Sequence, residues 1–401
     1  MSRRLDNATA RRLLLHLYGL STPPRRRIDA GGLEALIERI GFVQVDSIAT
    51  VARAHQMILF ARNDTYRPAL LTRLLERDRT LFEGWTHDAS LIPTRLYPYW
   101  RTRMVREKPR IVARWRQWQR APFEAQVAHV LAHVESRGPT MARDLAPDVP
   151  RGGQGWWDWH PGKTALEFLW RTGSLAVTGR VNFQKVYDLT ERVLPSSALK
   201  EEVEDAALTD WACRSAFERM GFATPAEIAG FWDCIDAKDA AAWCTGRDGL
   251  LPCEVEGAQG DRARRFLMSE ALADRLGDLP EPPARLRVLS PFDPLIRDRR
   301  RLAHVFGFDY RIEVFVPEAQ RRYGYYVFPL LEGARLIGRI DMKRDGKAGI
   351  LRVARLWLEP KVRWSGGREA ALESELARIA RFAGCDAVHV APGALEADGI
   401  A

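Results

Sequence analysis

Hydrophobic positions near the N-terminus change from the spacing of a helix to the spacing of a strand. Over residues 33–40 they recur every three or four positions, which predicts one face of an amphipathic helix, and Gly41 follows where a C-cap is expected. Over residues 42–46 apolar and polar side chains alternate, which indicates an extended segment. Gln44 and Asp46 are therefore expected to lie on one face of that segment.

The order of helices followed by a hairpin occurs three times along the chain. After the first helices, residues 80–93 predict two short strands around a polar turn. Helices over 123–134 and 163–172 precede a second hairpin over 174–187, whose turn is expected at Gly179. A third set begins near residue 210. Three helices and a hairpin are typical of the winged helix-turn-helix, so the pattern predicts three tandem winged-helix units.

A proline-rich joint at residues 279–283 precedes a part of the chain that favours strands. These strands are expected over 312–316, 325–331, 336–343 and 350–358, with a final helix over 368–383. The sequence therefore predicts an α+β fold. Its four parts are winged helix 1 over residues 1–118, winged helix 2 over 119–200, winged helix 3 over 201–283 and a β-rich region over 284–401.

Charge adds one restriction on the partner. Lys and Arg number 61 against 52 Asp and Glu, which gives a formal charge of +9, and the apolar share of 46% is that of a packed globular protein. Arginines cluster at residues 25–27, at 297 with 299–301, and at 321–322. Such clusters can line a groove for a polyanion, although a solvated basic face explains them as well.

Metal and membrane sites are not indicated. The five cysteines contain no C-x-x-C pair, and the His129–His133 pair has Val130 where a zincin helix needs Glu. We expect no metal and no cofactor. No apolar run reaches the roughly 18 residues that span a bilayer, so we expect a cytoplasmic protein without membrane contact.

The tripeptide Gln44-Val45-Asp46 is the best candidate for chemistry, because no P-loop, nucleotide-binding glycine motif, Gly-x-Ser-x-Gly elbow or kinase motif is present. Two polar side chains two residues apart on a strand project side by side. One water can then be held by the Gln44 amide and deprotonated by the Asp46 carboxylate. The alternative is structural: Asp46 or Ser47 is the N-cap of a helix that begins near Ile48.

Several segments resemble one known family. The runs 40–48, 51–55 and 59–62, together with residues 85–90, 289–295, 308–317 and 323–327, are similar to those of the YcaQ (AlkX)-type crosslink-repair DNA glycosylases. The resemblance runs from about residue 10 to about residue 365. The sister AlkZ branch carries Gln at both polar positions of the tripeptide, whereas this chain has Gln44 and then Asp46, as the YcaQ branch does.

The resemblance implies three winged helices around a DNA channel and hydrolysis of the N-glycosidic bond of N7-alkylguanine, with unhooking of interstrand crosslinks. It assigns Gln44 to positioning the hydrolytic water and Asp46 to activating this water or stabilising the cationic sugar. The implied partner is double-stranded DNA, bound by a monomer.

Further candidates come from the predicted hairpin and the basic segments. His87 and Asp88 can contact the lesion or a phosphate, or His87 can donate to a backbone carbonyl while Asp88 forms a turn. The remaining DNA-contact candidates are Arg53, Arg299, Arg322 and Tyr325. The competing hypothesis for the whole chain is a winged-helix DNA-binding regulator without catalysis.

Overall fold

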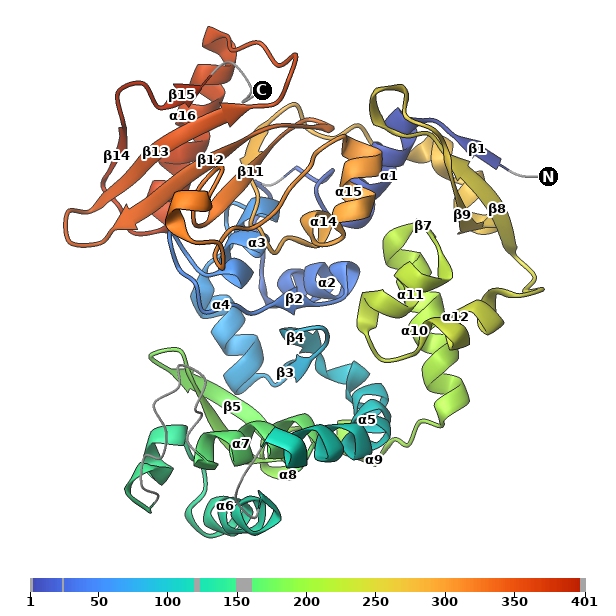
Figure 1. Ribbon diagram of the computed structural model, residues 1–401, viewed down its shortest axis with the longest axis vertical. Coiled ribbons are helices and arrows are strands. Elements are labelled where there is room, and N and C mark those ends of the chain that lie inside the picture. The colour runs from blue at the N-terminus through green and yellow to red at the C-terminus, as the bar shows by residue number, and fades with distance from the viewer. Residues whose placement is uncertain (1–2, 24, 119–122, 149–160, 397–401) are drawn as a thin grey trace.

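The computed structural model describes residues 3–23, 25–118, 123–148 and 161–396, which form a mixed structure of helices and strands (Figure 1). The expected α+β class is confirmed.

The region that carries Gln44 consists of helices around a three-stranded antiparallel sheet. Its elements are α2 (Ala30–Ile40), β2 (Val43–Gln44), α3 (Ala54–Arg62), α4 (Pro68–Thr72), the π-helix η1 (Arg73–Arg77), β3 (Leu81–Trp85), β4 (Ala89–Pro93), the 3-10 helix η2 (Thr94–Leu96) and α5 (Tyr97–Trp118). The sheet order is β2-β4-β3. Leu33, Ile37 and Ile40 of α2 are buried as their spacing predicts. Gly41 caps α2 with a φ of 93°, a region that favours glycine, so the chain turns directly into β2.

The second region contains the predicted helices and hairpin. Its elements are α6 (Phe123–Arg137), the 3-10 helix η3 (Ala142–Asp148), α7 (Pro161–Arg171), β5 (Leu175–Val181), β6 (Gln184–Leu189), α8 (Thr190–Val193) and α9 (Ser196–Lys200). The turn expected at Gly179 is wrong. Gly179 lies inside β5 at a register shift, and the chain reverses at Asn182 and Phe183, which have φ values of 48° and 69°. A Cβ on Gly179 would lie 2.9 Å from a Glu76 carboxylate oxygen, so the glycine permits close packing instead.

The third region includes the N-terminus of the chain. Its elements are β1 (Arg3–Leu5), α1 (Asn7–Leu17), α10 (Asp205–Met220), β7 (Phe222–Ala223), α11 (Pro225–Trp232), α12 (Ala237–Cys244), β8 (Leu250–Val255), η4 (Ala258–Gly260), β9 (Arg264–Ser269), α13 (Glu270–Asp274) and η5 (Leu276–Asp278). The sheet order is β1-β8-β9-β7, with β1 parallel to β8. Residues 3–17 therefore pack with segments that lie more than 200 residues later.

The C-terminal region is built on a sheet of six strands. Its elements are β10 (Leu286–Val288), α14 (Pro294–Arg297), α15 (Arg299–Phe306), the 3-10 helix η6 (Glu318–Gln320), β11 (Val327–Glu332), β12 (Arg335–Asp345), β13 (Ile350–Leu358), α16 (Gly366–Phe382), β14 (Ala387–Val390) and β15 (Leu395–Glu396). The sheet order is β10-β11-β12-β13-β14, and β15 also pairs with β13.

The strand expected over residues 312–316 is wrong. This segment belongs to a loop before β11, closed by the Glu313 carboxylate. That carboxylate accepts hydrogen bonds from the backbone N–H groups of Arg322, Tyr323 and Gly324 at 2.9–3.0 Å. A side chain used in this way holds the segment in a loop despite its alternating pattern.

The other three regions lie around the region that contains the short sheet with Gln44. Figure 1 shows α2, β2 and β4 in the middle of the molecule, with α10 to α12 on one side and the C-terminal sheet on the other. The Arg180 guanidinium of β5 pairs with the Glu83 carboxylate of β3 at 2.7 and 2.9 Å, which joins the second region to this sheet. The winged-helix classification and the boundaries at residues 118, 200 and 283 stay predictions.

Candidate active site

Gln44 lies on the shortest strand of the central sheet. β2 pairs antiparallel with β4, so that Gln44 is opposite Ser90, and the flanking Val43 and Val45 are both buried. The two valines anchor the strand in the core, as the alternating pattern predicts. The Gln44 side chain is thereby held beside the β3–β4 turn.

That turn brings His87 and Asp88 to Gln44. The Nε2 amide group of Gln44 donates to Oδ2 of Asp88 at 3.1 Å, and Nε2 of His87 lies 3.1 Å from Oε1 of Gln44. The other Asp88 oxygen, Oδ1, accepts from the Ala89 N–H at 2.8 Å. The structure thus brings together three residues that are predicted separately from the sequence.

Asp46 is a half-buried carboxylate that forms no ion pair with any arginine of the described residues. Among the described residues, its one hydrogen bond is from the Ile48 N–H to Oδ1, at 2.7 Å. Burial raises the pKa of Asp46, the Ile48 hydrogen bond opposes this rise, and the negative charge of Asp88 adds to it. Oδ2 of Asp46 has no hydrogen-bond partner among the described residues, and the carboxyl group takes up a proton more readily than an ordinary aspartate.

The neighbouring titratable groups are also shifted. Burial raises the pKa of Asp88, although the hydrogen bonds from Ala89 and Gln44 oppose this. Burial lowers the pKa of His87 to about 3, with Arg297 and Arg103 contributing in the same direction. His87 is consequently neutral at physiological pH, and the site presents two carboxylates and no imidazolium.

The helix-cap alternative for Asp46 is wrong. α3 begins at Ala54 and its N-cap is Arg53, so no helix starts near Ile48. The hydrogen bond from Ile48 to Asp46 spans two residues, which is an Asx turn in the link between β2 and α3. The turn accounts for the hydrogen bond to Oδ1 of Asp46, whereas Oδ2 forms no hydrogen bond with the described residues.

A cavity of about 310 Å³ adjoins Gln44. The aromatic side chains of Phe42, Phe231 and Phe292 line it, together with Gln44 and Arg297. Such a space beside the polar cluster is large enough for a small ligand group.

The other candidates for DNA contact lie at the N-cap of α3, in α15 and in the loop before β11. The Arg53 guanidinium stacks on Phe183 of the second region, with its Cζ 3.9 Å from the ring centroid. Arg299 is exposed and donates to the Tyr310 carbonyl at 3.1 Å. Arg322 and Tyr325 are exposed in the loop before β11, where Tyr325 has an exposed fraction of 42%. Whether these four bind DNA stays a prediction.

Sequence analysis missed the contribution of α14. The Asp293 carboxylate accepts hydrogen bonds from two guanidinium nitrogens of Arg62, at 2.7 and 3.0 Å. Neither side chain is exposed, so this buried pair fixes α14 against α3. At the end of α14, Arg297 lies 3.2 Å from Nδ1 of His87. Arg297 follows the segment 289–295 by two residues, so the family resemblance of this segment was the available indication that α14 lies near the site. Arg301, in contrast, is buried and bonds the carbonyls of Met220 and Phe222, so that part of the arginine cluster is structural.

Metal ligands and membrane-spanning helices were two further possibilities raised by the sequence. Among the described residues, no group of three or more His, Cys, Asp or Glu side chains could hold a metal ion. In the same part of the chain, no helix is both long and apolar enough to cross a membrane.

Comparison with known proteins identifies the class as DNA glycosylases. The model of the family described as "DNA glycosylase AlkZ-like" matches residues 37–382, and the chain belongs to this family. It is therefore a hydrolytic DNA N-glycosylase. The fold is similar to that of the DNA glycosylase AlkZ of Streptomyces sahachiroi, with a TM-score of 0.63 and 16% identity over 98% of this chain and 100% of that chain. The segment matched by the family includes Gln44, Asp46, His87 and Asp88.

Proposed function

We propose that this glycosylase hydrolyses the N-glycosidic bond of N7-alkylguanine in duplex DNA, with Asp46 and Gln44 as its catalytic residues. The observation that carries the proposal is the half-buried Asp46 carboxylate, which has one oxygen without a partner among the described residues and lies near the Gln44–Asp88 pair. Asp46 accepts the proton of the attacking water, and its charge stabilises the sugar cation.

The leaving group explains why one base suffices. Alkylation at N7 places a positive charge on guanine, so the base departs without a strong acid to protonate it. The transition state is then similar to an oxocarbenium ion at C1′ of the deoxyribose, which a nearby carboxylate stabilises. The neutral His87, whose pKa is lowered to about 3, fits this scheme because it supplies no proton at physiological pH.

Gln44 has the role of orienting water. Its amide is held between His87 and Asp88 at 3.1 Å on each side, and this leaves one amide hydrogen and one oxygen lone pair for a further contact. We propose that a water bound there is presented to Asp46, which lies two residues further along the chain, just after β2. The amide supplies no charge of its own, so we expect it to act on orientation and Asp46 to act on proton transfer.

Interstrand crosslinks are the second substrate that we propose. The combination of Gln44 and Asp46, rather than two glutamines, resembles the branch that unhooks crosslinks. A crosslinked guanine is tethered to the opposite strand and cannot leave the duplex completely, so its excision needs a site that accepts bulk at N7. We propose that the protein acts on this DNA as a monomer in the cytoplasm.

Incubation with an end-labelled duplex that carries one N7-methylguanine tests the proposed activity. Alkaline cleavage after the reaction reveals abasic sites, which should accumulate with enzyme and not in its absence. A duplex in which ordinary guanine replaces the lesion is the matched control. Binding without any abasic product would contradict the proposal and favour the regulator hypothesis.

A duplex joined by a single N7–N7 crosslink tests the second substrate. Denaturing electrophoresis should show conversion of the joined strands into single strands, at a rate that depends on Asp46. Excision of N7-methylguanine together with an intact crosslink would limit the proposal to monoadducts.

A further inference from the structure

Arg297 connects three elements at the edge of the candidate active site. It is the last residue of α14, which the buried Arg62–Asp293 pair fixes against α3. Its guanidinium reaches the end of α11 and the β3–β4 turn. No role for Arg297 follows from the proposed chemistry so far.

The guanidinium is held in one orientation. Nη1 donates to the Phe231 carbonyl at 3.1 Å, and Nη2 donates to the Gly230 and Phe231 carbonyls at 3.2 and 3.1 Å. Its Cζ also lies 5.1 Å from the centroid of the Phe42 ring and 5.4 Å from that of Phe231. A group with this many fixed contacts is a rigid donor.

The remaining hydrogen on Nη1 of Arg297 points to His87. Nη1 of Arg297 lies 3.2 Å from Nδ1 of His87. A guanidinium can only donate, so Nδ1 must accept, and a neutral imidazole that accepts at Nδ1 carries its proton on Nε2. Arg297 therefore selects the Nε2–H form of His87.

This choice determines which way the Gln44 amide faces. The Nε2–H of His87 donates to Oε1 of Gln44 at 3.1 Å, so the amide nitrogen of Gln44 must face Asp88, to which it donates at 3.1 Å. The opposite amide orientation would place Oε1 of Gln44 against the Asp88 carboxylate, where two acceptors repel each other.

We propose that Arg297 is a positioning residue, which fixes the Nε2–H tautomer of His87 and, through it, the orientation of the Gln44 amide. The effect on excision rests on the proposed function, whereas the tautomer is a property of the free protein.

Thr86 provides an alternative partner for His87 if Arg297 is removed. Oγ1 of Thr86 lies 3.2 Å from Nδ1 of His87 and can accept a hydrogen bond from it. Without the guanidinium, the Nδ1–H tautomer can form, and Nε2 becomes an acceptor that faces Oε1 of Gln44. The amide must then turn or lose a hydrogen bond, which disturbs the bound water.

Nitrogen NMR of the full chain with ¹⁵N-labelled histidine tests the tautomer directly. The His87 signals are assigned by their loss in His87→Phe, which keeps a ring beside Phe42. Wild-type protein should show protonated Nε2 and unprotonated Nδ1, and Arg297→Met should show protonated Nδ1 or a mixture. Protonated Nδ1 in the wild type, or an unchanged tautomer in Arg297→Met, would overturn the inference. Protonated Nδ1 in the wild type overturns the inference even where Arg297→Met does not fold.

Single-turnover excision of N7-methylguanine tests the consequence. We expect Arg297→Met and His87→Phe each to lower the rate about 10- to 100-fold, as losses of supporting hydrogen bonds do, with duplex affinity unchanged. In a Gln44→Ala background, Arg297→Met should cost less than about twofold more, because both changes act on the same group. Arg265→Met, which removes an arginine with a side chain 91% exposed on β9, is the control and should excise as the wild type does.

Other results separate the explanations. Losses that multiply in the double variant, or a loss of duplex affinity with an unchanged rate at saturation, would make Arg297 a DNA contact and overturn the inference. A wild-type protein that excises no alkylated base refutes the proposed function, and the tautomer experiment still decides the role of Arg297.

Discussion

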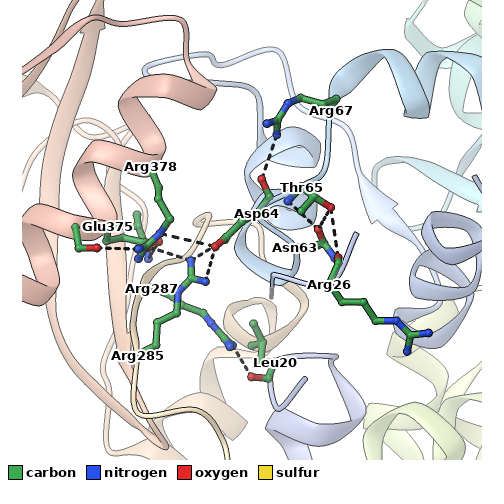
Figure 2. Close-up of polar contacts among 12 residues, drawn as sticks. Leu20, Arg26, Asn63, Asp64, Thr65, Arg67, Arg285, Arg287, Glu375 and Arg378 are labelled. Atoms are coloured by element: carbon green, nitrogen blue, oxygen red, sulfur yellow. Dashed lines mark hydrogen bonds and ion pairs between the residues drawn. The ribbon is translucent and has the colours of Figure 1, made fainter. Parts of the chain in front are cut away.

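Two aspartates flank α3 and have opposite surroundings. Asp64, after the helix, accepts hydrogen bonds from two guanidinium nitrogens of Arg285, at 2.8 Å each (Figure 2). Asp46, before the helix, has the Ile48 N–H as its one hydrogen-bond donor among the described residues. The charge that contributes to its pKa is that of another carboxylate, Asp88. The same type of side chain is therefore paired with arginine at one end of α3, whereas at the other end it forms no ion pair with an arginine of the described residues.

The cluster around Asp64 stabilises the fold. Arg285 and Arg378 also bind the Glu375 carboxylate of α16, and the second oxygen of Glu375 accepts from the Val288 N–H of β10 at 3.2 Å. Figure 2 shows how these side chains converge from the segment after α3, from the chain around β10 and from α16. Every carboxylate in this cluster has a guanidinium partner, so none is left to bind a substrate.

The cluster around Asp46 has the reverse properties. Its carboxylates have raised pKa values, its histidine is neutral, and its arginine, Arg297, bonds the histidine and not the acids. Such a site is less stable than one with matched charges. Perturbed groups that are kept despite this cost are typical of catalysis.

The largest expected effect separates the two aspartates by activity. Asp46→Asn keeps the shape and the hydrogen bond from Ile48 but removes the base and its charge, so excision should fall by roughly 10²- to 10⁴-fold. The melting temperature at neutral pH should not fall, because the variant no longer buries this charge. Single-turnover kinetics and thermal unfolding measure the two quantities. A parallel loss of both would indicate a structural role for Asp46.

Glu375→Gln should show the converse behaviour. The Glu375 side chain is 1% exposed, and its loss leaves Arg285 and Arg378 with less compensation, so the free energy of unfolding should fall by about 3–5 kcal/mol. Excision by the fraction that remains folded should keep its wild-type rate. Denaturant titration measures the change, with the exposed Glu373→Gln of the same helix as the control. A slow but fully stable variant would couple this cluster to the chemistry.

The pH dependence of excision should report on Asp46. The base acts when ionised, and its pKa is raised, so the single-turnover rate should fall as the pH is lowered through values above the ordinary aspartate range near 3.9. Asp88→Asn removes the neighbouring negative charge, and the midpoint should therefore move to lower pH. Spontaneous depurination is subtracted with an enzyme-free control. A midpoint that is unchanged in Asp88→Asn would contradict the coupling of the two acids.

The smallest effect concerns binding. If Arg299 contacts a DNA phosphate, Arg299→Gln should weaken duplex binding slightly and reduce the slope of log affinity against log salt by about 0.9. Fluorescence anisotropy over a range of salt concentrations measures the slope. An unchanged slope would remove Arg299 from the DNA interface.

Local patterns predicted the strand that carries the site. The helix that ends at Gly41, the alternation around Gln44 and the hairpin next to His87 each depend on neighbours in the sequence, and each is present in the structure. The shared face of Gln44 and Asp46 stays a prediction, because β2 ends at Gln44, whereas the resemblance to a glycosylase family is confirmed.

Contacts between distant segments could not be predicted in this way. His87 and Arg297 are 210 positions apart, and the parallel pairing of Arg3 with Cys253 joins opposite parts of the chain. Periodicity describes which face of an element is buried but not its partner. The strand prediction for residues 312–316 was wrong for a related reason, since the Glu313 carboxylate accepts hydrogen bonds from a segment about ten residues further along.

The most direct test of the central claim uses two duplexes that differ only in one lesion, N7-methylguanine or uracil. The released base is measured for the wild type and for Asp46→Asn. Cationic N7-methylguanine should be released by the wild type and only at a residual rate by the variant. Uracil, which is neutral at the bond to be broken, should be retained by both. Efficient release of uracil in an Asp46-dependent reaction would contradict the account, because it would require a general acid that this scheme does not contain.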